Sequence, residues 1–400
     1  MKTKDFIAQS AKYSANNYNP LPVVIANGDG IWVWDIEGKK YLDCLSAYSA
    51  LNQGHCHPEI IQVLIEQAGR ATLTSRAFMN DQMGDFLQKL CEMCEMEMAL
   101  PMNTGAEAVE TALKAARKWG YQVKGVAANQ AEIIVCRDNF HGRTISIVSA
   151  STEEQYRDGF GPFTPGFKVI DFGNAQQLEA AITPNTVAFL VEPIQGEAGI
   201  LVPPESYLTE VRKICSKNRV LFILDEIQTG LGRTGKLFAY QHEKNAKPDA
   251  LILGKALGGG VYPVSAMVAS REVLGVFKPG DHGSTFGGNP LGSAVARKAL
   301  DVILKEKLAE NSQELGQYFM KQLRAIASPH VKEIRGRGLF IGIEIKTSSG
   351  PARPFCERLM DLGVLAKETH AQTIRLAPPL IIKKKDIDWL VEQIKEVLEA

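Results

Sequence analysis

The sequence lacks an excess of charge of either sign. Its 400 residues include 45 Lys and Arg and 45 Asp and Glu, so the formal net charge at pH 7 is zero. Nucleic acids and anionic membranes attract proteins through an excess of positive charge. The composition therefore argues against a nucleic-acid or membrane partner and favours small molecules or other proteins.

The sequence also lacks segments that direct a chain into a membrane. No apolar run approaches the roughly 18 residues that span a bilayer. The opening stretch "MKTKDFIAQSAKYSANNYNP" has no apolar core of a secretory signal, and it contains Asp5 and no arginine, unlike a transit peptide. We therefore expect a cytoplasmic location.

Cysteine is scarce, with seven scattered residues. This odd number predicts reduced thiols and no disulfide framework. Cys91 and Cys94 have CxxC spacing, but no second pair follows, and "CEMCEMEMAL" is typical of a helix. In "GHCHP" we prefer a tight turn before Pro58, which begins a helix, over a metal site. No metal is expected.

Periodic patterns divide the chain into three parts. Alternation in "GIWVWDIEGKKYLDCL" predicts a β-hairpin or meander in residues 1–57, which we assign to a small domain. In residues 58–305, helical patterns alternate with the aliphatic runs "EIIVC", "VAFLVEP", "VLFILDE" and "DALILG", which predicts a large α/β domain with a mostly parallel sheet flanked by helices. Residues 306–400, with helices and the strands "GLFIGIEI" and "TIRLAPP", predict the smaller α+β domain.

Polar residues follow four of the predicted strands. Ligands of open α/β sheets bind at the carboxyl ends of the strands. These ends carry Phe140, His141 and Arg143 after the first run, Glu192 and Glu197 after the second, Asp225 and Gln228 after the third, and Lys255 after the fourth. Together they predict an active site with a nucleophilic lysine, a carboxylate and an anion-binding arginine.

Lys255 stands between an aliphatic run and three glycines in "PDALILGKALGGG". Taken alone, such a lysine is more often a surface group with a snorkelling stem. Beside Asp225 it meets the needs of pyridoxal phosphate (PLP), because the amine forms a Schiff base with the aldehyde and the aspartate keeps the pyridine nitrogen protonated. Burial would lower the pKa of the amine and make it a usable nucleophile and base.

The phosphate of PLP needs its own site, and two stretches can supply one. In "MNTGAEAVETALKAAR", Thr104, Gly105 and Ala106 stand at a helix start, where free N–H groups and the helix dipole favour an anion. An ordinary capped helix is the alternative. "HGSTFGGNP" offers Ser284 and Thr285, for a phosphate or for a turn alone.

Two other glycine motifs do not fit their usual contexts. "GLGRTG" at residues 230–235 matches the GxGxxG of NAD-dependent oxidoreductases, but "EIQT" separates it from the strand and bulky "KLFAY" follows it. "LGKAL" lacks the first glycine and the Ser or Thr of a P-loop. A non-catalytic binding protein would not need Lys255 and Asp225 together.

Nearly the whole chain, from Tyr18 to "RLAPP" near residue 379, resembles the class III, fold-type I, PLP-dependent aminotransferases. The motifs are "FLVEPIQGEAG", "LDEIQTGLGRTG", "LGKALGGGVYPVSA" and "HGSTFGGNPLG". Within that family, "NNYNPLPVVI", "YSALNQGHCHP", "LTSRAF" and "GEAG" resemble the ornithine branch, whereas "NFHGRT" departs from the "NFWGRT" of some of its members. The acetylornithine branch, or another class III ω-aminotransferase, is the alternative.

The resemblance implies a role for each site residue. Lys255 would bind PLP and later shuttle a proton, and Asp225 would pair with the pyridinium. The other cofactor contacts would be Thr104, Gly105, Ala106, Phe140, His141, Gln228, Ser284 and Thr285, of which Thr285 would come from the second subunit of a homodimer. The substrate contacts would be Tyr18, Tyr48 and Arg143, with Arg375 as a clamp for 2-oxoglutarate and Glu197 as its partner. The implied reaction is ping-pong transfer of the δ-amino group of L-ornithine to 2-oxoglutarate.

Overall fold

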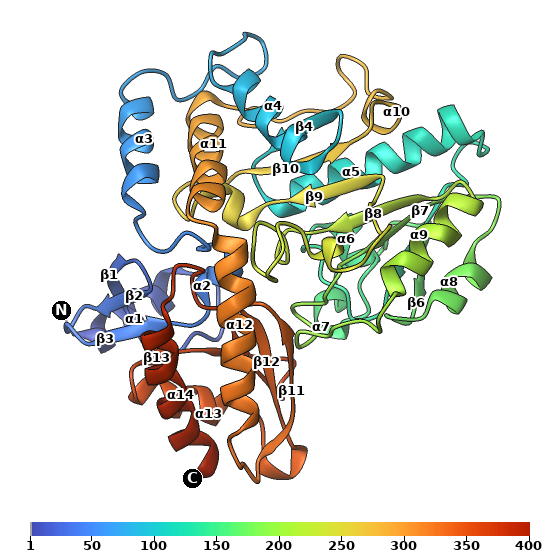
Figure 1. Ribbon diagram of the computed structural model, residues 1–400. Helices are drawn as coiled ribbons and strands as arrows, with labels where there is room; N and C mark the ends of the chain where they lie inside the picture. The colour runs from blue at the N-terminus through green and yellow to red at the C-terminus, as the bar shows by residue number, and fades with distance from the viewer. Residues whose placement is uncertain (1) are drawn as a thin grey trace.

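The computed structural model describes residues 2–400, and its largest element is a seven-stranded sheet (Figure 1). All neighbouring strands are parallel except β10, which is antiparallel to both of its neighbours. This confirms the predicted α/β fold. The strands lie in the order β4 (Met98–Met102), β10 (Ser265–Ala269), β9 (Ala250–Leu253), β8 (Leu221–Asp225), β7 (Thr186–Val191), β5 (Glu132–Cys136) and β6 (Phe167–Ile170).

Helices cover both faces of this sheet because both faces are apolar. In β5, Ile133 and Val135 pack towards α5 (Gly105–Trp119), whereas Ile134 and Cys136 belong to the core on the opposite face. Successive side chains of a strand point to opposite sides, so a fully apolar strand buries both faces. The other helices of this part are α3 (Pro58–Ala68), α4 (Met83–Cys94), α6 (Ile145–Ser149), α7 (Glu154–Arg157), α8 (Ala175–Ala181), α9 (Tyr207–Lys217), α10 (Arg271–Leu274) and α11 (Pro290–Lys305), with short helical turns at Gly120–Lys124, Ala239–His242 and Lys255–Gly258.

Two four-stranded sheets lie beside the C-terminal helices in the lower part of Figure 1. The first, β1-β2-β3-β13, joins the two ends of the chain, since Val364 of β13 pairs in parallel with Leu42 of β3. The proposed domain boundaries at residues 57/58 and 305/306 stay a prediction. These sheets and their helices contain β1 (Ile25–Asp29), β2 (Trp32–Asp35), β3 (Lys40–Asp43), β11 (Val331–Arg337), β12 (Phe340–Ile345), β13 (Val364–Leu365), β14 (Lys367–Thr369), β15 (Thr373–Leu376), α2 (Ser46–Ser49), α12 (Leu308–Arg324), a turn at Thr347–Ser349, α13 (Arg353–Asp361) and α14 (Lys384–Glu399).

The predicted hairpin is confirmed, because β2 and β3 pair antiparallel on either side of the turn at Glu37 and Gly38. A helix, α1 (Thr3–Tyr13), precedes these strands and buries none of its residues. One local prediction needs correction. The stretch "CEMCEMEMAL" is not wholly helical, since α4 ends at Cys94 and β4 begins at Met98. Between them Glu95 adopts a left-handed conformation with φ of 51°, which ends the helix. The four runs predicted as parallel strands are β5, β7, β8 and β9.

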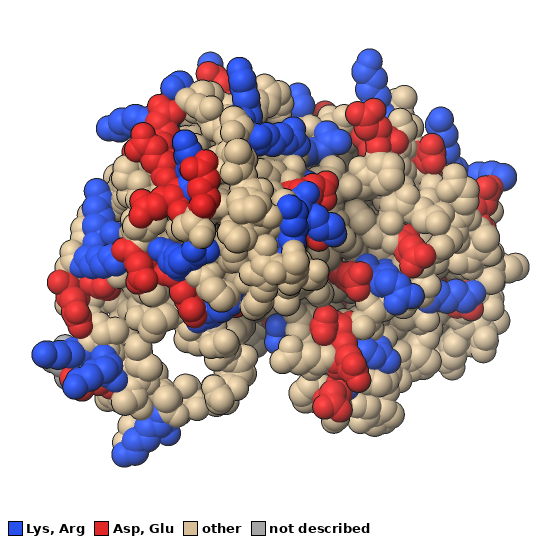
Figure 2. All heavy atoms as spheres, turned by 90° about the horizontal axis from the view of Figure 1, so that it is seen from below, with Lys and Arg blue, Asp and Glu red and all other residues tan. Residues whose placement is uncertain are grey.

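The surface carries both signs of charge, mixed over the face seen in Figure 2. Among residues 2–400, no helix is both long enough and apolar enough to cross a membrane.

Candidate active site

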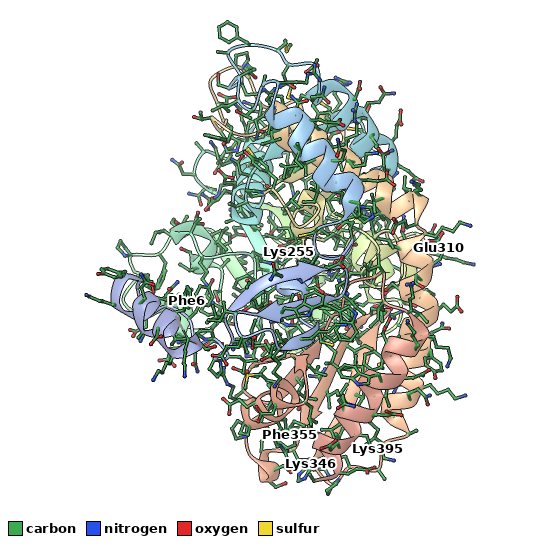
Figure 3. All side chains as sticks on the ribbon, turned by 90° about the vertical axis from the view of Figure 1, so that its left-hand side faces the viewer. Phe6, Lys255, Glu310, Lys346, Phe355 and Lys395 are labelled. Carbon is green, nitrogen blue, oxygen red and sulfur yellow. The ribbon has the colours of Figure 1, made fainter. Side chains whose placement is uncertain are left out.

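The predicted polar residues meet at one edge of the large sheet. All of those predicted to follow the strands except Arg143 and Glu197 line a cavity of about 210 Å³ at the carboxyl ends of the parallel strands. The lysine that follows β9 lies near the middle of the molecule (Figure 3). The cavity is lined by Gly105, Ala106, Phe140, His141, Gly142, Glu192, Asp225, Ile227, Gln228, Thr229 and Lys255.

Lys255 follows β9 after a single glycine and is partly buried. Its φ of 46° is left-handed, which is uncommon for a residue with a side chain and is typical of strained functional positions. Burial lowers the pKa of Lys255, and the neighbouring carboxylates, Glu197 first among them, oppose this without cancelling it. The amine is therefore easier to deprotonate than a surface lysine.

Asp225 ends β8 and is buried with two partners. Its Oδ2 lies 2.7 Å from Nδ1 of His141, and its Oδ1 accepts the N–H of Ile227 at 3.1 Å. Burial lowers the pKa of His141, but the hydrogen bond and charge of Asp225 outweigh burial, so the pKa is raised. Nε2 of His141 is buried and has no partner among residues 2–400. The pair therefore places the imidazole of His141 directly against the carboxyl group of Asp225.

Glu192 is a second buried carboxyl group on the cavity wall. It accepts the backbone N–H of Phe140 at 2.9 Å and that of Gly196 at 3.3 Å. Burial raises the pKa of Glu192 to about 7. These bonds tie the loops after β5 and β7 together and so fix the side of the cavity that carries the phenyl ring.

The helix α5 begins at the cavity with a capping box. Thr104 accepts the N–H of Glu107, whose carboxylate in turn accepts the N–H of Thr104 at 2.8 Å. The next two residues, Gly105 and Ala106, line the cavity at the positive end of a 15-residue helix. Their N–H groups have no acceptor within the helix, so they can bind an anion. Thr104 itself caps the helix and does not line the cavity.

An ion pair between a buried arginine and a partly buried glutamate adjoins the cavity. Arg375, on β15, donates from Nη1 to Oε1 of Glu197 at 2.5 Å and is 1% exposed. The ring of Tyr48 lies over the guanidinium, 4.7 Å from Cζ to the ring centroid. Burial raises the pKa of Glu197, but the charge and hydrogen bond of Arg375 outweigh burial and hold the pKa below its ordinary value. The ion pair is therefore present at neutral pH.

Gln228 connects the ion-pair region with the cavity. Its side-chain amide lines the cavity and donates to the backbone carbonyl of Tyr48 at 3.4 Å. A side chain at Gly196 would meet this amide at 1.9 Å, so the amide of Gln228 would have to move to admit one. The two parts of the site are thus in direct contact.

Two predicted substrate residues lie further out. Arg143 is exposed and stacks on Tyr156, with Cζ 4.2 Å from the ring centroid. Tyr18 is 65% exposed and lines a separate cavity of about 410 Å³ together with Tyr48. The structure therefore places both at the periphery of the ion-pair region.

Ser284 and Thr285 do not line the cavity of their own chain. Ser284 accepts the side-chain N–H of Asn103 at 2.8 Å and the N–H of Gly287 at 3.3 Å. Within this chain the hydroxyl of Ser284 therefore stabilises the turn at residues 284–287, the alternative to a phosphate contact in the sequence analysis. Thr285 is exposed.

Sequence reasoning missed two residues at the site. Tyr156 lies on the short helix α7 and carries no motif, yet it stacks on Arg143 and meets Phe140 edge to face at 5.9 Å. Ile227 narrows the cavity beside the helix start, where a side chain at Gly105 would meet its Cδ1 at 3.0 Å. The spacing "DEIQT" could have indicated Ile227, because alternate residues after a strand face the same side.

The motif "GLGRTG" serves the fold. It does not open an α-helix, and the side chain of Arg233 is completely buried. Arg233 donates to the carbonyls of Leu339 and Pro378 and to the side-chain oxygen of Asn52. The motif therefore joins three distant segments and does not have the context of a dinucleotide site.

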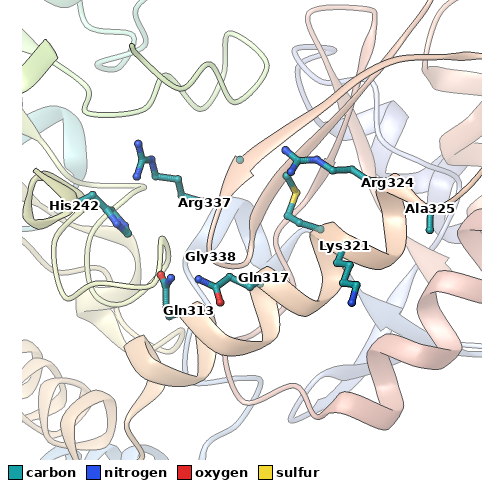
Figure 4. Close-up of a pocket in the computed structure, with 11 residues that line it drawn as sticks. His242, Gln313, Gln317, Lys321, Arg324, Ala325, Arg337 and Gly338 are labelled. Atoms are coloured by element: carbon teal, nitrogen blue, oxygen red, sulfur yellow. The ribbon is translucent and has the colours of Figure 1, made fainter. Parts of the chain in front are cut away.

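A wide groove of about 650 Å³ lies elsewhere, between α12 and the turn that joins β11 to β12 (Figure 4). Lys321, Arg324 and Arg337 make it basic, and burial lowers the pKa of His242 to about 4, so this histidine is neutral at pH 7. None of the residues that the structure places on its wall is a carboxylate. The groove lacks the groups that the cavity at Lys255 combines.

Known proteins resemble this chain over its full length. The family model described as aminotransferase class-III matches residues 13–398. The ornithine aminotransferase of Brevibacillus brevis is 61% identical over 399 residues, which cover 100% of this chain and 99% of that protein.

Solved structures agree with this match. The crystal structure of ornithine aminotransferase from Toxoplasma gondii ME49 superposes with a TM-score of 0.98 at 46% identity, covering 100% of this chain and 95% of that one. Acetylornithine aminotransferase from Elizabethkingia anophelis gives a TM-score of 0.90 at 46% identity, covering 100% and 99%. This chain belongs to the class III aminotransferases.

Proposed function

We propose that this chain is a PLP-dependent transaminase that transfers the δ-amino group of L-ornithine to 2-oxoglutarate. The products would be glutamate and glutamate 5-semialdehyde, which cyclises to pyrroline-5-carboxylate. The observation that carries the proposal is the Arg375–Glu197 ion pair beside the cavity of Lys255. Both substrates carry an α-carboxylate that could bind Arg375. Because Glu197 can pair with Arg375 in place of one substrate and not the other, one site can bind the two substrates in different orientations. The 61% identity to a named ornithine aminotransferase supports the same substrate.

The cavity offers a partner for each part of PLP. The free N–H groups of Gly105 and Ala106 suit the phosphate, Asp225 suits the pyridine nitrogen, and Lys255 suits the aldehyde. When bound, PLP supplies an electron sink for the carbon that loses a proton. Gln228 would hold the phenolic oxygen, and Phe140 would stack on the ring.

His141 supports Asp225 in this arrangement. Its Nδ1 lies 2.7 Å from Oδ2 of Asp225, and this contact fixes the orientation of the carboxyl group. An aspartate held towards the pyridine nitrogen would keep that nitrogen protonated. Lys255, whose pKa burial lowers, would take up and return the proton at the reacting carbon.

The substrate residues would act in two settings. While Glu197 occupies Arg375, ornithine would bind with its α end at Tyr18 and Arg143, which leaves the δ-amine directed at Lys255. For 2-oxoglutarate, the α-carboxylate would replace Glu197 on Arg375, because bidentate pairing with arginine is strong and directional. Arg143 would then hold the second carboxylate.

A homodimer would complete the site, with Thr285 reaching the phosphate of the partner subunit. Support comes from large apolar side chains that lie exposed on one chain, including Phe78 at 75%, Met79 at 88% and Phe286 at 47%. Helix α1, which carries Phe6 and projects from the body in Figure 3, also has no buried residue. Exposed apolar groups of this kind mark protein interfaces.

A cytoplasmic location is part of the proposal. All seven cysteines are free thiols, and five of them are buried. Thiols persist in a reducing compartment.

The proposal is tested with purified holoenzyme and 2-oxoglutarate, comparing L-ornithine with N-acetylornithine as amino donor. We expect pyrroline-5-carboxylate from ornithine at a rate at least tenfold higher than any turnover of N-acetylornithine, because about 1.4 kcal/mol of lost pairing already gives a factor of ten. A preference for N-acetylornithine would replace the proposed substrate by that of the alternative branch. Absence of an absorbance band of bound PLP would overturn the cofactor assignment.

A further inference from the structure

Four consecutive residues that follow β3, Ser46–Ser49, form a single left-handed turn beside the Arg375–Glu197 ion pair. Ser46, Ala47, Tyr48 and Ser49 have φ values of 50°, 47°, 61° and 68°. Side chains disfavour this conformation, and none of the four is the glycine or asparagine that adopts it readily. The hydroxyl groups of Ser46 and Ser49 are also buried without a partner among residues 2–400. The local sequence therefore opposes the turn, and surrounding groups must impose it.

Asp43 is the group that holds the start of the turn. Its Oδ1 accepts the N–H of Leu45 at 2.9 Å and that of Ser46 at 2.8 Å, and the residue is 7% exposed. Charge-assisted hydrogen bonds of this kind are about twice as strong as neutral ones. The carboxylate thereby fixes the direction in which the chain leaves β3.

His55 in turn orients Asp43. Its Nε2 lies 2.8 Å from Oδ2 of Asp43. The backbone of His55 exchanges two hydrogen bonds with Gly30, at 3.0 and 2.8 Å, and its ring packs so closely on Gly28 that a side chain there would meet it at 2.8 Å. The histidine is thus anchored to the end of β1, outside the turn that Asp43 holds.

The turn presents Tyr48 to the ion pair. Its ring covers the guanidinium of Arg375, 4.7 Å from Cζ, and its backbone carbonyl accepts the side-chain N–H of Gln228 at 3.4 Å. A right-handed turn would direct the Tyr48 side chain elsewhere, because handedness sets the side on which Cβ leaves the backbone. Arg375 has only Glu197 as an ionic partner among residues 2–400, and its Nε has no acceptor there.

We propose that Asp43, oriented by His55, is a positioning residue for substrate selection. It holds the left-handed turn that lays Tyr48 on Arg375, and the ring keeps the guanidinium in place for Glu197. Without the ring, Arg375 gains freedom to take the α-carboxylate of an amino donor. The inference rests on the proposed function, because it concerns the choice between ornithine and an α-amino donor. Asp43 is connected to Tyr48 only through the backbone of the turn, so it affects substrate selection without contacting the reacting atoms.

The test measures the two amino-donor half-reactions by stopped-flow absorbance in the holoenzyme, with glutamate and with ornithine. For Asp43→Ala we expect the ratio of glutamate to ornithine rate constants to rise about five- to tenfold, the size of effect that loss of a cation–π contact produces. Ala47→Gly alone should leave the ratio within about twofold, because Ala47 is exposed and glycine accepts either handedness. In the double variant Asp43→Ala/Ala47→Gly, at least half of the rise in the ratio should be reversed, since glycine makes the left-handed turn easier to form.

Each outcome decides the question. A role in folding alone would slow both half-reactions equally, and an unchanged ratio in Asp43→Ala overturns the inference. If Asp43→Ala does not fold, His55→Ala takes its place, with a rise in the ratio expected and His55→Gln, which can still donate to Asp43, restoring it. If the unaltered enzyme does not react with ornithine, the proposed function fails. If it reacts and neither Asp43→Ala nor His55→Ala changes the ratio, only this inference fails.

Discussion

Replacement of Glu197 by alanine tests how one site accepts the δ-amine of ornithine and the α-keto group of 2-oxoglutarate. The change leaves Arg375, 1% exposed, without its ionic partner. Breaking a buried ion pair costs about 3–5 kcal/mol. Because the Glu197 side chain is 20% exposed, water screens the pair and reduces this cost to about 2–3 kcal/mol.

In the unaltered enzyme, an α-carboxylate must displace Glu197 from Arg375, and in Glu197→Ala this cost is absent. At about 1.4 kcal/mol for each factor of ten, we expect the ratio of glutamate to ornithine half-reaction rates to rise about 30- to 150-fold. Glutamate gains a free clamp, whereas ornithine can now bind with its α-amine at Lys255, the unproductive orientation. The net change is a loss of preference for the δ position.

Stopped-flow absorbance of holoenzyme mixed with each amino donor measures the ratio directly. Glu197→Gln should show most of the effect, because it keeps the size of the side chain and removes its charge. Glu205→Ala, which changes an exposed carboxylate outside the cavity, is the control and should match the unaltered enzyme. A ratio that does not move in Glu197→Ala would refute the idea that Glu197 guards Arg375.

Three other changes probe the cavity and the fold. Lys255→Ala should abolish turnover yet still bind PLP non-covalently. Borohydride reduction of the unaltered enzyme, followed by peptide mapping, should find the cofactor on residue 255. The control Lys385→Ala, at an exposed lysine, should change neither result. Asp225→Ala should retain PLP but lose several orders of magnitude in rate, about the scale seen when a preorganised charge partner is removed, as measured by single-turnover absorbance. Burial raises the pKa of Glu226 from 4.5 to about 7, so its contribution to stability is present below pH 4.5 and is lost as pH rises through about 7, a change of roughly 3 kcal/mol. Glu226→Gln, which resembles the protonated acid, should therefore gain Tm relative to the unaltered protein as pH rises from 5 to 8.

These expectations fail in distinct ways. Labelling at a lysine other than 255, or near-normal turnover of Asp225→Ala, would remove the assigned role of that residue. A Tm difference between Glu226→Gln and the unaltered protein that is constant from pH 5 to 8 would show that Glu226 does not titrate in that range.

Local patterns in the sequence were enough to predict the large sheet and its chemical edge. Each buried strand reads as a short aliphatic run, and parallel strands end at the same edge, so Asp225 and Lys255 were expected to meet. The helix start at Gly105 carries its own capping signal. Such features depend on residues within a few positions of one another, and this is why they can be read without a structure.

Tertiary structure decided the parts that depend on distant segments. The ion pair joins Glu197, which follows β7, to Arg375 on β15. No local sequence pattern indicated this pair, and only the family resemblance implied it. Tyr156 joins the site only because helix α7 packs on the loop that carries Arg143 and Phe140. The left-handed turn at Tyr48 contradicts the preferences of its own residues, because Asp43 and its neighbours outweigh them. Backbone handedness and long-range ion pairs are set by the whole fold, since the groups that stabilise them lie far away in the chain.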